Sequence, residues 1–178
     1  HVGAARREIG VPTVFNLIGP LANPAAVGNM LVGVRDASVA RMMAEALKSR
    51  GVRNAWLVHG DGGLDELSIS GASVVVTLRD GEVGNLVVDP DDLGITRAPL
   101  DAIRGGSPAV NADIVRRTLD GEAGPVRDIV LLNAAAALCV AGRVSDLASG
   151  FDAAADAVAS GVATRVLETF IRTSQATA

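Results

Sequence analysis

Met30-Leu31-Val32-Gly33-Val34 is a short apolar run that predicts a buried strand. Asp36 follows it as a candidate helix cap. An apolar stripe with helical spacing comes next: Val39, Met42, Met43, Ala46 and Leu47. The run Asn54-Ala55-Trp56-Leu57-Val58 then predicts a second strand. Because two strands joined by a helix normally pair in parallel, residues 30–58 predict an α/β fold.

Two further apolar runs, at residues 74–78 and 83–88, flank the dipeptide Asp80-Gly81. Aspartate followed by glycine favours the tight turn of a hairpin, so we expect one local antiparallel pair here. The rest of the sheet is expected to follow the direction of the first two strands. The predicted fold class is therefore α/β, with a mostly parallel sheet flanked by helices.

The C-terminal third of the chain predicts helices. Residues 126–141 are apolar on nearly every side, which indicates a buried helix. Asn133 lies inside that run and needs a polar partner, so we expect it to make a hydrogen bond within the protein. Residues 151–159 and 162–173 are rich in alanine and amphipathic, and we expect them to cover the sheet.

The composition argues against several classes of function. A net charge of −4, a single Trp and no Tyr leave neither a basic groove nor an aromatic stacking surface, so nucleic acid is not an expected partner. Cys139 is the only cysteine and cannot form an internal disulfide, which fits a reducing compartment. Neither an apolar run of about 18 residues nor a signal peptide is found, so we expect a cytoplasmic protein.

The stretch His59-Gly60-Asp61-Gly62-Gly63-Leu64-Asp65-Glu66 directly follows the second predicted strand. Ligands of parallel α/β sheets gather at the carboxyl ends of strands, and this turn offers three carboxylates. Hard oxygen ligands of this kind suit Mg²⁺. A solvated acidic turn is the alternative. For His59, a hydrogen-bonded histidine at a strand end is favoured over a catalytic one.

The stretch Phe15-Asn16-Leu17-Ile18-Gly19-Pro20-Leu21-Ala22-Asn23-Pro24 has an unusual composition of apolar residues, prolines and asparagines. Its apolar spacing predicts one short turn of helix, which Gly19-Pro20 should stop, and Asn23-Pro24 should then force an extended exit. Gly19 would let a ligand approach the main chain closely. A tight structural connector is the alternative.

Together these stretches resemble the C-terminal half to two-thirds of an anthranilate phosphoribosyltransferase. The run from residue 15 to residue 24 is the most specific part of the resemblance, and the other parts occur in the order and spacing of that family. They are Ala5-Arg6-Arg7-Glu8-Ile9-Gly10, His59-Gly60 with Gly63-Leu64-Asp65-Glu66, Gly105-Gly106 with Asn111-Ala112, and Asn133-Ala134.

The resemblance implies transfer of a phosphoribosyl group from phosphoribosyl pyrophosphate to anthranilate, a step of tryptophan biosynthesis. Arg6 matches the arginine that faces the anthranilate carboxylate, and Gly19 matches a glycine that lines the anthranilate pocket. Asp65 and Glu66 match the acidic pair that binds Mg²⁺. No residue of this chain is assigned as a protein general base.

The resemblance also implies an incomplete active site. The glycine-rich pyrophosphate loop of that family and the first helices of its small helical domain would lie upstream of His1. We therefore expect residues 1–24 to be the remnant of the helical domain and its hinge, and residues 25–178 to be the C-terminal part of the α/β domain. The fragment is expected to be inactive alone, and its parent protein to be a homodimer.

Two alternatives remain open from the sequence. Pyrimidine nucleoside phosphorylases share the implied fold, but they do not normally carry the run at residues 15–24. A non-catalytic ligand-binding domain of the same fold is the other alternative. It is disfavoured because Arg6, Asp65 and Glu66 are all present.

Overall fold

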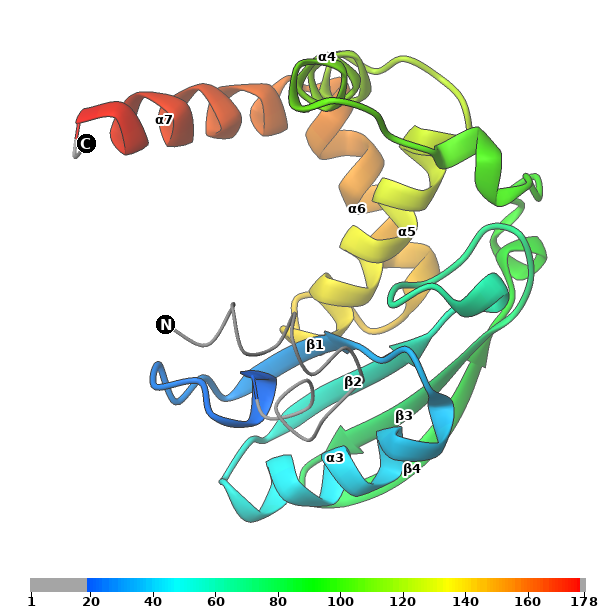
Figure 1. The fold of residues 1–178 in the computed structure, drawn as a ribbon, viewed down its shortest axis with the longest axis vertical. Coiled ribbons are helices and arrows are strands. Elements are labelled where there is room, and N and C mark those ends of the chain that lie inside the picture. Colours follow the sequence, from blue (N-terminus) through cyan, green and yellow to red (C-terminus); the bar gives the residue numbers. More distant parts are fainter. Residues whose placement is uncertain (1–18, 177–178) are drawn as a thin grey trace, which may run out of the picture.

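A mixed four-stranded sheet is the central element of the computed structural model, which describes residues 19–176 (Figure 1). Its strands follow one another in space as they do in the chain: β1 (Asn29–Gly33), β2 (Asn54–His59), β3 (Ser73–Arg79) and β4 (Glu82–Val88). β1 and β2 are parallel, whereas β3 runs antiparallel to both of its neighbours. The expected parallel pair is confirmed, but the expectation of a mostly parallel sheet is wrong.

Two connections explain the antiparallel half of the sheet. Residues 60–72 contain only the short 3-10 helix η1 (Asp61–Gly63) and stay at the carboxyl end of β2, so that Val74 lies opposite His59. At the β3–β4 turn, Asp80 and Gly81 have φ angles of 49° and 84°, the backbone of a two-residue hairpin. Neither connection includes the crossover helix that parallel pairing requires.

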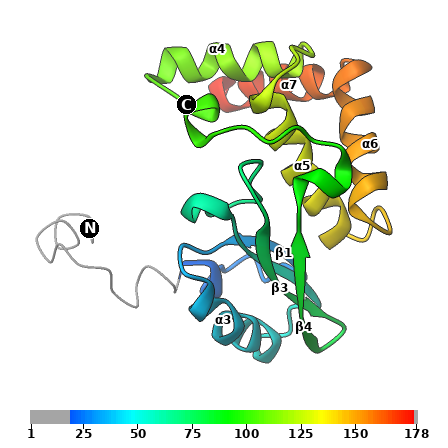
Figure 2. The same cartoon turned by 90° about the vertical axis from the view of Figure 1, so that its right-hand side faces the viewer.

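Helix α3 (Ala37–Ser49) covers one face of the sheet, as Figure 2 shows. Asp36 begins the helix, because its Oδ1 accepts a hydrogen bond of 2.8 Å from the N–H of Ser38. Of the predicted apolar stripe, Met43 and Leu47 are buried against the strands and Val39 packs beside them, but Met42 is exposed, so this part of the prediction is wrong. Ala40 and Ala44 complete the buried face of the helix. Buried members of this first core cluster include Val32, Met43, Leu47, Leu57 and Leu78.

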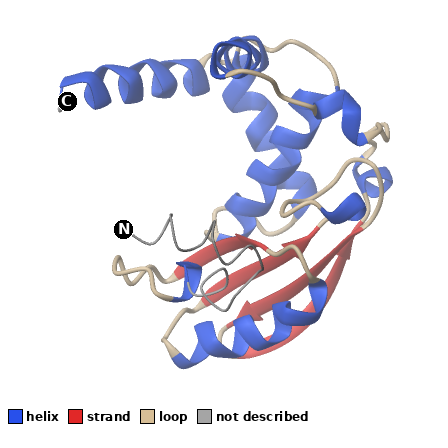
Figure 3. Ribbon diagram, in the orientation of Figure 1, coloured by secondary structure: helices blue, strands red, loops and turns tan. Residues whose placement is uncertain are grey.

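Helix α5 (Pro125–Val140) lies against the opposite face of the sheet (Figure 3). Its buried side chains pack on β2, on β3 and on the loop between these strands. This second core cluster includes Val58, Leu67, Val75, Ile129 and Leu132. The prediction of a buried helix at residues 126–141 is therefore confirmed, with its limits shifted by one residue.

Helices α4 (Pro108–Leu119), α6 (Leu147–Ala159) and α7 (Val162–Ala176) extend the structure beyond the sheet (Figures 1 and 2). Only α6 reaches the second core cluster, through Leu147 and Phe151. The main contacts of α7 are with α6 and α4, and none of its residues is buried. The expectation that this last helix covers the sheet is wrong. Within residues 19–176, no helix has both the length and the apolar character to cross a membrane.

Asn133 of α5 ties the loop between β2 and β3 to the helix. Its Oδ1 accepts a hydrogen bond of 2.8 Å from the N–H of Leu67, and its Nδ2 donates to the carbonyl oxygen of Leu67 at 2.9 Å. The same Nδ2 lies 3.0 Å from the carbonyl oxygen of Ile129. These contacts confirm the predicted structural role of Asn133. They also fix the backbone directly after Asp65 and Glu66.

We expect Asn133→Ala to lower the free energy of unfolding by about 2–4 kcal/mol. The buried N–H and C=O groups of Leu67 would lose their partners, and an unpaired buried polar group costs about 1–3 kcal/mol. Urea unfolding measures this loss as a lower midpoint at an unchanged slope.

Asn111→Ala is the matched control. The Oδ1 of Asn111 accepts a hydrogen bond of 2.7 Å from the N–H of Gly106, but both residues are exposed and water can replace the bond. A loss below about 1 kcal/mol is expected for this variant. Equal losses for the two variants would contradict the special role of Asn133.

Candidate functional site

The acidic pair Asp65-Glu66 lies at the carboxyl ends of the two parallel strands. Gly33 is the last residue of β1, and a β carbon added there would overlap the carbonyl oxygen of Asp65 and lie 2.6 Å from its carbonyl carbon. Gly60 directly follows β2, and a β carbon there would overlap the carbonyl oxygen of Glu66. Both positions therefore require glycine, since the neighbouring atoms belong to the backbone. The predicted location of the acidic turn is confirmed.

The turn that leads to the acidic pair closes on itself. The N–H of Gly60 donates to the carbonyl oxygen of Leu64 at 2.8 Å. Between them, Gly62 and Gly63 have φ angles of 75° and 82°, which few residues other than glycine adopt. The glycine-rich sequence thus serves to bring the chain back over the end of β2.

Asp61 differs from Asp65 and Glu66 because its carboxylate already has a hydrogen-bond partner within the loop. Its Oδ2 accepts a hydrogen bond of 2.7 Å from the Ser70 hydroxyl, which in turn lies 2.8 Å from the hydroxyl of Ser68. The hydroxyl of Ser73 accepts from the N–H of Ser68 at 2.9 Å. This serine network joins the two ends of the loop. It assigns Asp61 a structural role.

Asp65 and Glu66 are exposed, and neither carboxylate has a hydrogen bond or an ion pair to any residue in the described part of the chain. Partial burial and, as the smaller cause, the negative charge of Asp65 raise the pKa of Glu66 above its ordinary value. Two adjacent carboxylates without a counter-charge repel each other. A bound cation would remove that repulsion.

The acidic pair suits part of a magnesium coordination shell. Within residues 19–176, no group of three or more His, Cys, Asp or Glu side chains is placed to hold a metal. Mg²⁺ is typically held by one or two carboxylates, with water and substrate phosphate oxygens as the other ligands. The donor set of Asp65 and Glu66 fits that pattern, and it does not fit a metal that needs a closed protein cage.

His59 has a structural contact, as predicted. Its Nδ1 lies 2.9 Å from the carbonyl oxygen of Val34, and the N–H of Val34 donates to the carbonyl oxygen of Val58 at 2.8 Å. The imidazole therefore fastens the end of β2 to the residue that follows β1. This arrangement supports the position of the acidic turn.

The other two predicted site residues are at the N-terminal end of the chain. Arg6 lies outside the described residues. Gly19 is exposed, and no described atom lies within 4 Å of a β carbon built on it. None of residues 20–176 therefore crowds Gly19. It does not bring Gly19 into a described contact with Asp65 or Glu66.

The predicted end of the helical turn at Gly19-Pro20 is wrong, because residues 19–21 are helical. The last helical residue is Leu21, and beyond it the Oδ1 of Asn23 accepts a hydrogen bond of 2.9 Å from the N–H of Ala25. Leu21 packs against the first core cluster and anchors this stretch near α3.

Gly33 was not predicted as part of the site, although it is as important to the geometry as the carboxylates. The available signal was a glycine inside an apolar strand run, which often marks the close approach of another backbone segment. Which segment approaches could not be read from the run itself.

The chain resembles known proteins over nearly its whole length. The model of the glycosyl transferase family, a/b domain, matches residues 1–164. The anthranilate phosphoribosyltransferase of Hyphomonas neptunium is 46% identical over 98% of this chain and 51% of its own length. That of Symbiobacterium thermophilum is 50% identical over 94% of this chain and 49% of its own length. The chain thus spans about half the length of these curated relatives.

Solved structures give the same result. The anthranilate phosphoribosyltransferase of Thermus thermophilus superimposes with a TM-score of 0.88 at 40% identity, over 97% of this chain and 51% of that one. The Saccharomyces cerevisiae enzyme, solved in complex with PRPP and Mg, gives a TM-score of 0.87 at 30% identity over 97% of this chain and 50% of that one. Because the family model covers most of the sequence and the fold agrees, this chain belongs to the glycosyl transferase family through its a/b domain.

Proposed function

We propose that the protein of which this chain forms part transfers the phosphoribosyl group of phosphoribosyl pyrophosphate to the amino group of anthranilate. The products are phosphoribosyl anthranilate and pyrophosphate, in a step of tryptophan biosynthesis. The observation that carries the proposal is the unpaired Asp65-Glu66 pair on the glycine ends of β1 and β2, in a chain 46–50% identical to two anthranilate phosphoribosyltransferases. These relatives give no support to a nucleoside phosphorylase.

Asp65 and Glu66 would hold Mg²⁺. When bound, the cation would neutralise the negative charge that develops on the departing pyrophosphate. The chain contributes two carboxylates whose backbone is fixed by Gly33, Gly60 and the Asn133 contacts. Such positioning matters because transfer through a cation-like ribosyl group depends on orientation and electrostatics more than on a strong base. The related yeast structure with PRPP and Mg supports this assignment.

Arg6 and Gly19 would bind anthranilate. A guanidinium group recognises a carboxylate through two parallel hydrogen bonds, and a backbone without a side chain at Gly19 would admit a flat ring. Residues 1–24 would then belong to the helical domain and hinge, and residues 25–178 to the α/β domain. A related yeast structure holds 4-fluoroanthranilate, which supports an aromatic acid as the acceptor.

The chain alone would be inactive, since it corresponds to about half of each relative and the pyrophosphate loop is expected in the other half. The complete protein would be a cytoplasmic homodimer. Both statements rest on the family resemblance.

A chimera tests the proposed function directly. Residues 1–178 are joined to the N-terminal half of the Symbiobacterium thermophilum enzyme, which is 50% identical over the shared part. We expect loss of anthranilate fluorescence that requires both phosphoribosyl pyrophosphate and Mg²⁺, whereas residues 1–178 alone give none. A folded chimera that instead phosphorolyses uridine or thymidine would favour the nucleoside phosphorylase alternative.

Removing either charge of the acidic pair should reduce the magnesium response of the chimera. Asp65→Asn and Glu66→Gln are each expected to lower kcat by about 10²-fold or more, because a charge that acts at the developing pyrophosphate is lost. The magnesium concentration for half-maximal rate should also rise. Asp61→Asn is the control, since that carboxylate is already bonded to Ser70. The assignment fails if all three variants respond alike.

Arg6→Ala should weaken the use of anthranilate specifically. Loss of a charged hydrogen-bonding partner, worth about 1.5–3 kcal/mol, predicts a rise of about 10- to 100-fold in the Michaelis constant for anthranilate. The constant for phosphoribosyl pyrophosphate should change little. Arg7→Ala is the matched control because it removes the same charge from the neighbouring position. An unchanged anthranilate constant in Arg6→Ala would contradict the role of Arg6.

A further inference from the structure

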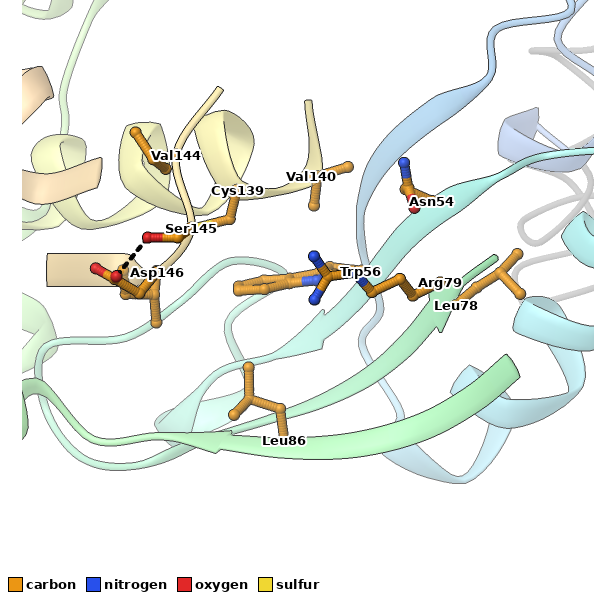
Figure 4. Close-up of a pocket in the computed structure, with 11 residues that line it drawn as sticks. Asn54, Trp56, Leu78, Arg79, Leu86, Cys139, Val140, Val144, Ser145 and Asp146 are labelled. Atoms are coloured by element: carbon orange, nitrogen blue, oxygen red, sulfur yellow. Dashed lines mark hydrogen bonds between the residues drawn. The ribbon is translucent and has the colours of Figure 1, made fainter. Parts of the chain in front are cut away.

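A cavity of about 250 Å³ lies between the sheet and the junction of α5 with α6 (Figure 4). Asn54, the first residue of β2, lines it, so the cavity is toward the amino end of that strand. The acidic pair is at the carboxyl end of the same strand. The cavity is therefore separate from the candidate site described above.

The walls of the cavity are mostly apolar. Trp56 from β2 and Leu86 from β4 lie on the sheet side, and Val140 and Leu147 lie on the helix side. An apolar cavity of about 150 Å³ accepts a benzene ring. This larger cavity has room for one flat ring with a small substituent.

Arg79 supplies an unused positive charge at this cavity. It pairs with Asn54 in the β2–β3 register, and Trp56 is two residues further along β2, so Arg79 and Trp56 are on the same face of the sheet. The guanidinium is exposed, and it has no hydrogen bond or ion pair to any described residue. It is thus free to bind an anion.

Asp146 limits the charge that the cavity accepts. Its Oδ1 accepts from the N–H of Ser149 at 2.8 Å and its Oδ2 from the Ser145 hydroxyl at 2.7 Å, and these bonds lower its pKa to about 2. Asp146 therefore stays ionised near neutral pH. Both of its carboxylate oxygens already accept a hydrogen bond. In the view of Figure 4, Asp146 lies to the left of Trp56, and the side chain of Arg79 overlaps the indole. A ligand with a second anionic group would be repelled from the Asp146 end.

Cys139 does not add a charge. Burial, and then the nearby Asp146, raise the pKa of its thiol, so it remains neutral near neutral pH. Among the described residues that line the cavity, the charged side chains are thus Arg79, which has no described partner, and Asp146, which accepts two hydrogen bonds.

We propose that this cavity is a second binding site, which takes a small flat monocarboxylate with its ring against Trp56 and its carboxylate on Arg79. A planar acid matches the apolar walls, and its single charge matches the guanidinium fork. The proposal uses neither Asp65 nor Glu66 and is independent of the proposed function.

The test uses Trp56 as its own probe. The sequence contains one Trp and no Tyr, so indole fluorescence reports this cavity alone. Titration of residues 1–178 with benzoate should change the fluorescence of Trp56 in a saturable way. Arg79→Gln should raise the dissociation constant at least about tenfold, as expected for the loss of a charged hydrogen bond, and Arg79→Lys should raise it less.

Three controls make the outcome decisive. Arg53→Gln removes an exposed arginine that does not line the cavity and should leave binding unchanged. Benzamide, which has the ring without the charge, should bind at least about tenfold more weakly than benzoate. The proposal is overturned by an unsaturable response, by equal binding of benzoate and benzamide, or by equal effects of Arg79→Gln and Arg53→Gln.

Discussion

The backbone of Asp65 and Glu66 packs directly on two strand ends that carry no side chain, and the candidate site depends on this contact. A β carbon at Gly33 or Gly60 would occupy the space of a carbonyl oxygen in the acidic pair. Asn133 holds the next part of the loop through both polar groups of Leu67. The two carboxylates therefore project from a segment that is fixed on both sides. Because the loop is already ordered, the binding of a ligand to the two carboxylates does not have to supply the free energy of ordering it.

The same turn separates a structural carboxylate from two available ones. Asp61 is bonded to Ser70 and belongs to the serine network that shapes the loop. Asp65 and Glu66 have no described partner, and their mutual repulsion contributes to the raised pKa of Glu66. No described Lys or Arg side chain pairs with either carboxylate, so the folded chain gains no stability from these two charges. Such unpaired negative charges at the end of a parallel strand pair are typical of a cation site.

Most helices and strands were predicted well because each depends on local pattern. The run at residues 30–34, the stripe of α3 and the turn at Asp80-Gly81 all have a periodicity or backbone preference that neighbouring residues alone produce. The direction of β3 was not predicted, because it depends on whether residues 60–72 cross the sheet or stay at one edge. The prediction that α7 covers the sheet was wrong for a similar reason. An amphipathic stripe shows that one side of a helix is apolar, but not which surface it contacts.

The amino-acid sequence was sufficient to predict an α/β chain, its strands and most of its helices, and the acidic pair as the candidate metal ligands. Resemblance of its motifs was sufficient to suggest the family. Tertiary structure was needed to distinguish Asp61 from its two neighbours and to identify Gly33 and Gly60 as the surface beneath the acidic pair. It was also needed to find the cavity beside Trp56. The physical reason is that these features depend on contacts between residues distant in the chain, and local pattern carries no information about such contacts.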